Sequence, residues 1–249
     1  MKSAAPSQDE AVARLRAELV GLHRELVSSG LVVWTAGNVS ARLPSGDLFL
    51  IKPSGVDYAD LTPESMILCD LDGTVVEGTL KPSSDTAAHA YVYRNMPQVG
   101  GVVHTHSSHA SGWAQARRAI PCLGTTHADH FDGPVPVTRG MTRAEIDGAY
   151  EHETGVVIVE TLDALGLDPL HMPGALVASH GPFTWGPDAA TAVANAVALE
   201  AVAAMAEQTL ALRPDIAAID AALLRRHFDR KHGVGAYYGQ PRPSVETGR

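Results

Sequence analysis

Short strands joined by tight turns occupy much of the first third of the sequence, and this pattern constrains the fold more than any other feature. Asp72-Gly73 is the strongest hairpin signal in the chain, and it lies between strand-like runs at 67–71 and 74–77. Strands joined by so short a turn run antiparallel. Further short strands are predicted at 31–34, 38–43 and 48–52. We therefore expect a sheet that is mainly antiparallel or mixed.

Helical patterns alternate with these strands. Four leucines between residues 15 and 26 follow the spacing of an amphipathic helix. Helices at both ends of the chain and between its strands predict a single α/β domain with α/β/α layers. We expect this domain to span 11–240, between tails at 1–10 and 241–249. Other helices are predicted from 62, over 85–95, after 105 as far as 115, from 142, over 189–212 and over 216–231, and other strands over 101–105, 175–179 and 183–185.

The composition argues against several kinds of partner. The 249 residues carry a formal net charge of −9, which disfavours nucleic acid and anionic membrane surfaces. The polar first ten residues lack the apolar core of a signal peptide. The most apolar stretch, 189–212, contains Asn195, Glu200 and Glu207, so we expect a buried helix rather than a membrane span. The two cysteines are too few for a disulfide framework, and a reducing, cytoplasmic location is expected.

Three histidines follow apolar strands and suggest a metal site. His104 and His106 stand two residues apart, so their imidazoles leave the strand on one face. Such a pair suits a zinc-type metal, although half-buried histidines bonded to the backbone are the alternative. His180 ends another apolar run, and three histidines leave the open position of a catalytic zinc. Asp85 begins a predicted helix, either as a carboxylate near the metal or as an N-cap.

Three polar segments carry groups that can bind a phosphate dianion. Hydroxyls, a lysine and free N–H groups at a helix start are suited to this task. No segment is specific alone, because Lys-Pro-Ser-Gly more often forms a plain turn. A chain of negative net charge can still bind one small anionic metabolite through local groups. The candidates are Gly37, Asn38, Lys52, Ser54, Gly55, Ser83 and Ser84.

Candidate acid/base residues lie in the second half of the chain. Asp129 is a possible general base in a predicted loop, with an Asx-turn as the alternative. His227 shares a predicted helical face with Ile216 and Ile219, which favours a hydrogen-bonded core histidine. Tyr238 lies near the end of the chain, where a phenol can transfer a proton if it reaches a site, and is otherwise a surface side chain.

In combination and in order, these segments resemble the class II aldolase/adducin family, and within it the sugar-phosphate 4-epimerases. The resemblance covers residues 11–240, and the ordered combination is specific although each segment alone is weak. The matching segments are Gly37-Asn38-Val39-Ser40, Lys52-Pro53-Ser54-Gly55, Lys81-Pro82-Ser83-Ser84-Asp85, His104-Thr105-His106, Thr125-Thr126-His127-Ala128-Asp129, Ser179-His180-Gly181-Pro182, Arg230-Lys231-His232-Gly233 and Tyr237-Tyr238-Gly239-Gln240.

The resemblance implies interconversion of L-ribulose 5-phosphate and D-xylulose 5-phosphate at C4. It implies Zn²⁺, or another divalent metal, held by His104, His106 and His180 with Asp85 as the fourth ligand. It also implies that the phosphate candidates above hold the substrate phosphate. Aldolases of the family usually have Glu where this chain has Asp85, which favours the epimerase. Ala36 departs from the epimerase pattern, which has Trp there, and this leaves fine substrate preference open.

The resemblance further implies Asp129 and Tyr238 as acid/base residues and His227 as another histidine of the site. The family forms a homotetramer with active sites between subunits, so Tyr238 is expected from a neighbouring subunit. An aldolase that cleaves a ketose phosphate such as L-fuculose 1-phosphate is the first alternative. A non-enzymatic, adducin-like binding module is more remote, because every candidate metal ligand is present. A purely structural zinc module is disfavoured by the neighbouring acid/base groups.

Overall fold

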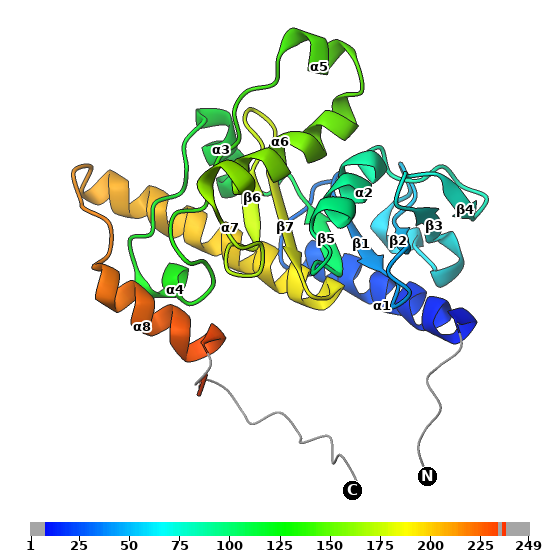
Figure 1. The fold of residues 1–249 in the computed structure, drawn as a ribbon, viewed down its shortest axis with the longest axis horizontal. Coiled ribbons are helices and arrows are strands. Elements are labelled where there is room, and N and C mark those ends of the chain that lie inside the picture. Colours follow the sequence, from blue (N-terminus) through cyan, green and yellow to red (C-terminus); the bar gives the residue numbers. More distant parts are fainter. Residues whose placement is uncertain (1–7, 234–235, 238–249) are drawn as a thin grey trace, which may run out of the picture.

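The centre of the molecule is a sheet in which neighbouring strands all run antiparallel (Figure 1). The computed structural model describes residues 8–233 together with 236 and 237. Within them, seven strands have the order β4-β3-β2-β1-β5-β7-β6, which confirms the predicted antiparallel character. The strands are β1 (Asn38–Arg42), β2 (Leu48–Ile51), β3 (Ile67–Asp70), β4 (Val75–Glu77), β5 (Gly101–His104), β6 (Gly174–Leu176) and β7 (Pro182–Gly186).

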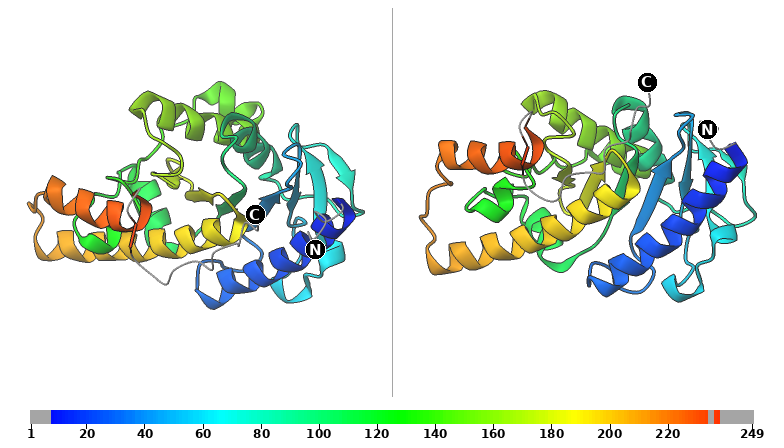
Figure 2. Two further views of the ribbon diagram at one scale, coloured as in Figure 1. Left: turned by 60° about the horizontal axis from the view of Figure 1, so that its bottom comes forward. Right: turned by 90° about the horizontal axis from the view of Figure 1, so that it is seen from below.

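Helices cover both faces of the sheet, as the α/β/α prediction requires (Figure 2). Val39 and Val103 belong to a buried cluster with leucines of α1 and alanines of α7. Phe49 and Val102 lie on the other face, in a cluster with side chains of α2 and α6. This alternation is the two-residue period of a strand buried on both sides. The helices are α1 (Gln8–Ser28), α2 (Thr86–Asn95), α3 (Ser108–Ala116), α4 (Thr125–Ala128), α5 (Arg143–Asp147), α6 (Tyr150–Leu165), α7 (Ala189–Leu212) and α8 (Ala221–His232), with single 3₁₀ turns at Tyr58–Asp60 and Pro63–Ser65.

Helix α7 is a helix of the core. By length and composition alone it could cross a membrane, but 50% of its most apolar window is buried inside the fold. Its buried residues include Val193, Leu199 and Val202. Asp188 begins the helix by accepting a hydrogen bond from the backbone N–H of Thr191 at 2.7 Å. The helix therefore forms part of the layer that closes one face of the sheet.

Two predicted strands differ from the structure. Residues 31–34 form no strand, because the N–H of Leu31 bonds back to the carbonyl of Leu26 at 3.0 Å and Trp34 has a left-handed backbone with φ 55°. The strand predicted at 175–179 ends at Leu176. There the N–H of Val177 donates to the carbonyl of Gly181 at 2.9 Å, which closes a tight turn in place of further pairing. A hydrogen-bonded turn at each segment therefore replaces the expected strand pairing.

The helices also differ from the prediction at several points. The last helix begins at Ala221, not at 216, because the Asp220 carboxylate caps the N–H groups of Ala222 and Leu223. Helix α6 was not predicted, and α4 lies where a loop was expected. At the other end of the chain, α1 already begins inside the expected 1–10 tail. Local capping groups and tertiary packing decided these boundaries.

Candidate active site

His104 ends β5 with its ring held on both sides. The side chain is buried and stacks on Phe183 of β7, with ring centroids 4.2 Å apart and planes at 18°. Its Nδ1 lies 3.0 Å from the carbonyl oxygen of Pro182. A carbonyl oxygen only accepts, so Nδ1 carries the proton and Nε2 presents a lone pair. Burial lowers the pKa of His104 to about 3, which keeps the ring neutral.

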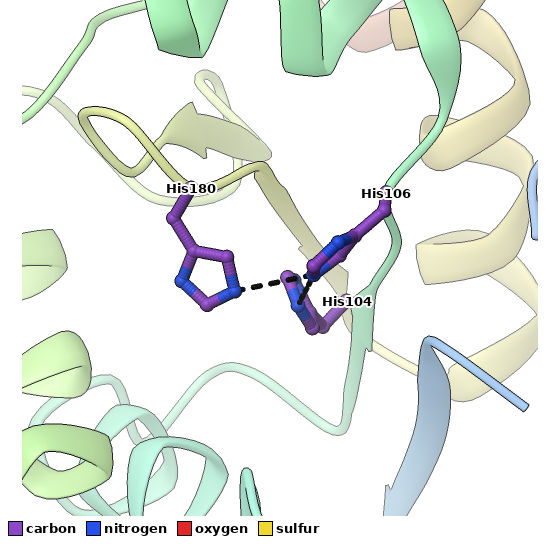
Figure 3. Close-up of side chains that lie close together, drawn as sticks. All are labelled: His104, His106 and His180. Carbon is purple, nitrogen blue, oxygen red and sulfur yellow. Dashed lines mark hydrogen bonds between the residues drawn. The ribbon is translucent and has the colours of Figure 1, made fainter.

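The three predicted histidines meet at their Nε2 atoms (Figure 3). His106 Nε2 lies 3.0 Å from His104 Nε2 and 3.2 Å from His180 Nε2. Ligand atoms at about 2.0–2.1 Å in a tetrahedral zinc site lie about 3.4 Å from one another, and both of these pairs are within a few tenths of an ångström of that distance. All three ligand atoms lie within 4.8 Å of one another. The chemistry of this donor set and its spacing therefore fit a divalent cation.

His180 reaches this point from the loop after β6. Ser179, just before it, has a positive φ of 63°, and the N–H of His180 bonds to the carbonyl of Val177 at 3.0 Å. The Nδ1 of His180 lies 3.4 Å from the hydroxyl of Tyr150 at the start of α6. Burial first, and then the neighbouring His106, lower the pKa of His180. A turn and a tyrosine thus orient the third imidazole.

Asp85 has the N-cap position of α2 but makes no capping hydrogen bond. Its Oδ2 instead accepts from Nδ2 of Asn38 at 2.6 Å. Burial alone would raise the pKa of Asp85, but His104, His89 and the Asn38 amide outweigh burial and lower it. The residue is therefore an ionised carboxylate beside the three histidines rather than a helix cap. Its ligation of a metal stays a prediction.

All seven phosphate candidates line one cavity of about 400 Å³, together with Asp85 and the three histidines. Gly37 is one of them, and its backbone has a positive φ of 90°. A Cβ there would lie 2.9 Å from the His104 carbonyl oxygen, so only glycine fits without a shift. The hydroxyl of Tyr58 donates to the Gly37 carbonyl at 2.9 Å.

Backbone hydrogen bonds join the two serine segments of this cavity. The N–H of Ser54 donates to the carbonyl of Lys81, and the N–H of Ser83 donates to the carbonyl of Lys52, both at 2.9 Å. Lys52 is buried, and its Nζ donates to the Pro53 carbonyl at 3.2 Å. Burial lowers the pKa of Lys52, although Asp57 opposes that effect. A cation and two hydroxyl-bearing loops therefore face one space.

Two cavity residues were missed at the level of sequence. Tyr150 and Glu151 line the same space, at the beginning of α6. Burial first, and then the charges of Asp85 and Glu151, raise the pKa of Tyr150. The sequence carries one signal for them, because they form the polar beginning of an otherwise apolar stretch. Predicting a helix there would have placed both residues at its N-terminus.

Asp129 and His227 lie together, but not among the residues that line this cavity. Asp129 follows α4 and accepts from Arg230 Nη2 at 2.6 Å and from His227 Nδ1 at 3.1 Å. Its side chain therefore bonds to α8 rather than forming an Asx-turn. Burial raises the pKa of Asp129, but the hydrogen bonds from Arg230 and His227 outweigh it and hold the pKa below its usual value. Figure 1 shows α4 and α8 side by side at one end of α7.

Two details of this second cluster differ from the sequence prediction. His227 does not share a helical face with Ile216 and Ile219, because α8 begins only at Ala221. Arg230, for which the sequence predicts no role, donates two hydrogen bonds to Asp129. Tyr238 lies outside the described residues.

A seven-stranded antiparallel sheet between helical layers, with a three-histidine group at the end of β5, defines a class II aldolase-like protein. The chain belongs to the class II aldolase and adducin family, since the model of the Class II Aldolase and Adducin N-terminal domain matches residues 17–206.

Solved structures agree with this assignment. An L-fuculose 1-phosphate aldolase is 21% identical with a TM-score of 0.72, and the match covers 90% of this chain and 97% of that one. L-fuculose-1-phosphate aldolase from Thermus thermophilus is 26% identical with a TM-score of 0.66, covering 82% and 100%. YgbL from Klebsiella pneumoniae, described as a candidate aldolase/epimerase/decarboxylase, is 25% identical with a TM-score of 0.68, covering 87% and 98%.

Proposed function

We propose that this protein is a divalent-metal enzyme that cleaves and re-forms a carbon–carbon bond of a phosphorylated ketose. Its specific activity would be the C4 epimerisation of L-ribulose 5-phosphate to D-xylulose 5-phosphate, with Zn²⁺ as the metal. The observation that carries the proposal is one cavity lined by three convergent imidazoles, an ionised carboxylate and the buried Lys52. One end of this cavity suits a metal and the other suits a phosphate.

The chemistry of the substrate requires bond cleavage. C4 of the ketose is not acidic, because the carbonyl is at C2, so removing the C4 proton cannot invert it. Cleavage of C3–C4 sends the bond's electron pair toward the C2 carbonyl and leaves glycolaldehyde phosphate. When bound, a divalent cation supplies a Lewis acid that stabilises negative charge on the oxygens beside the broken bond. Rotation of the aldehyde and attack on its other face give the epimer.

The chain's own residues divide this work. His104, His106 and His180, with Asp85, would hold the cation. Hydroxyl and N–H groups of the serine loops, together with Lys52, would hold the phosphate, so that glycolaldehyde phosphate stays bound while its aldehyde group turns. The glycine at 37 lets the backbone of its loop pack closely against the His104 carbonyl.

Two proton-transfer groups are needed on opposite faces, one to take the C4 hydroxyl proton and one to return a proton. Asp129 and Tyr238 are our candidates. Because Asp129 does not line the cavity of its own subunit, it would serve the reaction in a neighbouring subunit, which agrees with the proposed homotetramer. His227 and Arg230 would keep Asp129 ionised and in place.

A class II aldolase that releases the aldehyde is the second candidate, and the similarity to two L-fuculose 1-phosphate aldolases favours it. The presence of Asp85 rather than Glu favours the epimerase. A coupled assay for D-xylulose 5-phosphate, run beside an aldehyde trap, distinguishes them. We expect the epimer to form from L-ribulose 5-phosphate without release of free aldehyde. We also expect its formation to stop when a chelator removes the metal. Stoichiometric release of aldehyde would identify the aldolase, and activity unaffected by chelators would refute the metal.

A further inference from the structure

A buried polar chain lies beside the candidate metal ligands, and no step proposed above uses it. It consists of Ser40 on β1 and of His89 and Tyr93 on α2, all buried in the layer between the sheet and α2. Ser40 Oγ lies 2.7 Å from His89 Nδ1 and 2.7 Å from the Tyr93 hydroxyl. Buried polar side chains are costly unless they are hydrogen-bonded, so this chain calls for an explanation.

The direction of donation along this chain decides which nitrogen of His89 carries the proton. Burial raises the pKa of Tyr93, so its phenol stays protonated and is able to donate to Ser40 Oγ. With the phenol as donor, Ser40 donates its own proton to His89 Nδ1. A ring that accepts a hydrogen bond at Nδ1 carries its proton on Nε2.

That Nε2–H donor is buried and has no hydrogen-bond partner among the described residues. Asp85 stands one helical turn before His89, and i and i+4 side chains share a helix face. Asn38 and Ser40 lie on the same face of β1. Asn38 is hydrogen-bonded to Asp85 and Ser40 to His89, so two side-chain hydrogen bonds join β1 to the beginning of α2.

We propose that His89 is a positioning residue for Asp85: its Nε2–H donates to the Asp85 carboxylate when that carboxylate turns toward the three histidines. Ser40 and Tyr93 hold His89 in the required tautomer, and Asn38 supports the other side of the carboxylate. The inference rests on the proposed role of Asp85 in holding the metal. Partners of this kind orient metal ligands and raise metal affinity.

Zinc affinity of the purified full-length protein, measured by competition with a chromophoric chelator, tests the role directly. We expect His89→Leu to weaken zinc binding about 10–100-fold, as is typical for loss of a partner that orients a ligand. His89→Gln returns an N–H near the Nε2 position and should recover most of the loss. In an Asp85→Asn background, His89→Leu should weaken binding no further, because its effect passes through Asp85.

His23 provides a matched control. It is another fully buried histidine, bonded to the Leu19 carbonyl and to the N–H of Val39 on the opposite face of β1. His23→Leu should lower the unfolding temperature and leave zinc affinity unchanged. If His89→Leu does not fold, Ser40→Ala tests the same role. We expect this variant to weaken zinc binding several-fold.

Three results would overturn the inference. If the wild type binds zinc and His89→Leu binds it with the same affinity, the role of His89 is refuted while the proposed function stands. An equal loss in the Asp85→Asn background shows that His89 does not act through Asp85. A wild-type protein that binds no divalent cation removes the proposed function and this role with it.

Discussion

Replacing Gly37 by alanine separates backbone strain from close packing at the cavity. Gly37 and Gly46 have nearly the same positive φ, 90° and 88°, but a Cβ at Gly46 would meet nothing within 4 Å. At Gly37 it would lie 2.9 Å from the His104 carbonyl oxygen and 3.0 Å from Val32 Cγ1. Gly46→Ala therefore measures strain alone, and Gly37→Ala measures strain plus the displacement of His104 or Val32.

The expected sizes follow from these contacts. Holding a non-glycine residue at such a φ costs about 1–3 kcal/mol, and 1 kcal/mol lowers the unfolding temperature of a chain this long by about 2–4 °C. Gly46→Ala should therefore lose about 2–12 °C, with unchanged metal affinity. Gly37→Ala should lose more, because contacts under 3.0 Å force neighbouring atoms to move, and it should raise KM for the phosphorylated substrate.

Differential scanning calorimetry of both variants, with a parallel zinc titration, checks this reasoning. Equal temperature losses in the two variants would refute the argument from the His104 contact. An unchanged KM in Gly37→Ala would remove that loop from the phosphate site.

Three further predictions follow from the site. His106→Ala should lose bound metal and turnover together, because two Nε2 atoms remain; metal content after chelator-free purification, with His109→Ala as control, checks this. Asp129→Asn should destabilise the protein at pH 7. Because the pKa of Asp129 is lower in the folded than in the unfolded protein, the loss of stability relative to wild type should persist above about pH 4, near the unfolded pKa. It should vanish as the pH falls through the folded pKa. A stability difference between the variant and wild type that grows as the pH falls would contradict the predicted direction of this pKa shift. Tyr238→Phe should slow epimerisation about 10²–10⁴-fold with zinc affinity unchanged, and wild-type rates would exclude it as the acid/base residue.

Local signals were sufficient where one residue dominates a boundary. The hairpin at Asp72-Gly73, the capping box at Thr142 and Glu145, and the apolar helix 189–212 all appear as predicted. Tertiary bonding decided the failures. Residues 31–34 have strand-like composition, but Leu31 bonds back to α1, and no sequence pattern displays that bond. Helix α6 has no capping side chain at its start, since Ala149 is its N-cap, and so it lacks the local signal that marks α5 and α7.

The same division applies to the site. The spacing of His104 and His106 already implied a shared face, since strand geometry is local. The place of His180 at the end of an apolar run suggested it as a third ligand. Its approach to His106, 74 positions earlier, did not follow from spacing, because it depends on β5, β7 and β6 lying side by side. The partner of Asp129 was not predictable either, since Arg230 lies 101 positions away on a helix whose start was misjudged.

The separation of His106 and His180 along the chain has a consequence for folding. A cation held by both would close a loop of 74 positions, containing α3 to α6 and β6, and cross-links that close long loops remove the most entropy from the unfolded chain. Hydrogen exchange should therefore slow on zinc addition throughout the segment between the two histidines, and less in α1, which lies outside the loop. The bound metal would then stabilise the fold as well as serve the reaction.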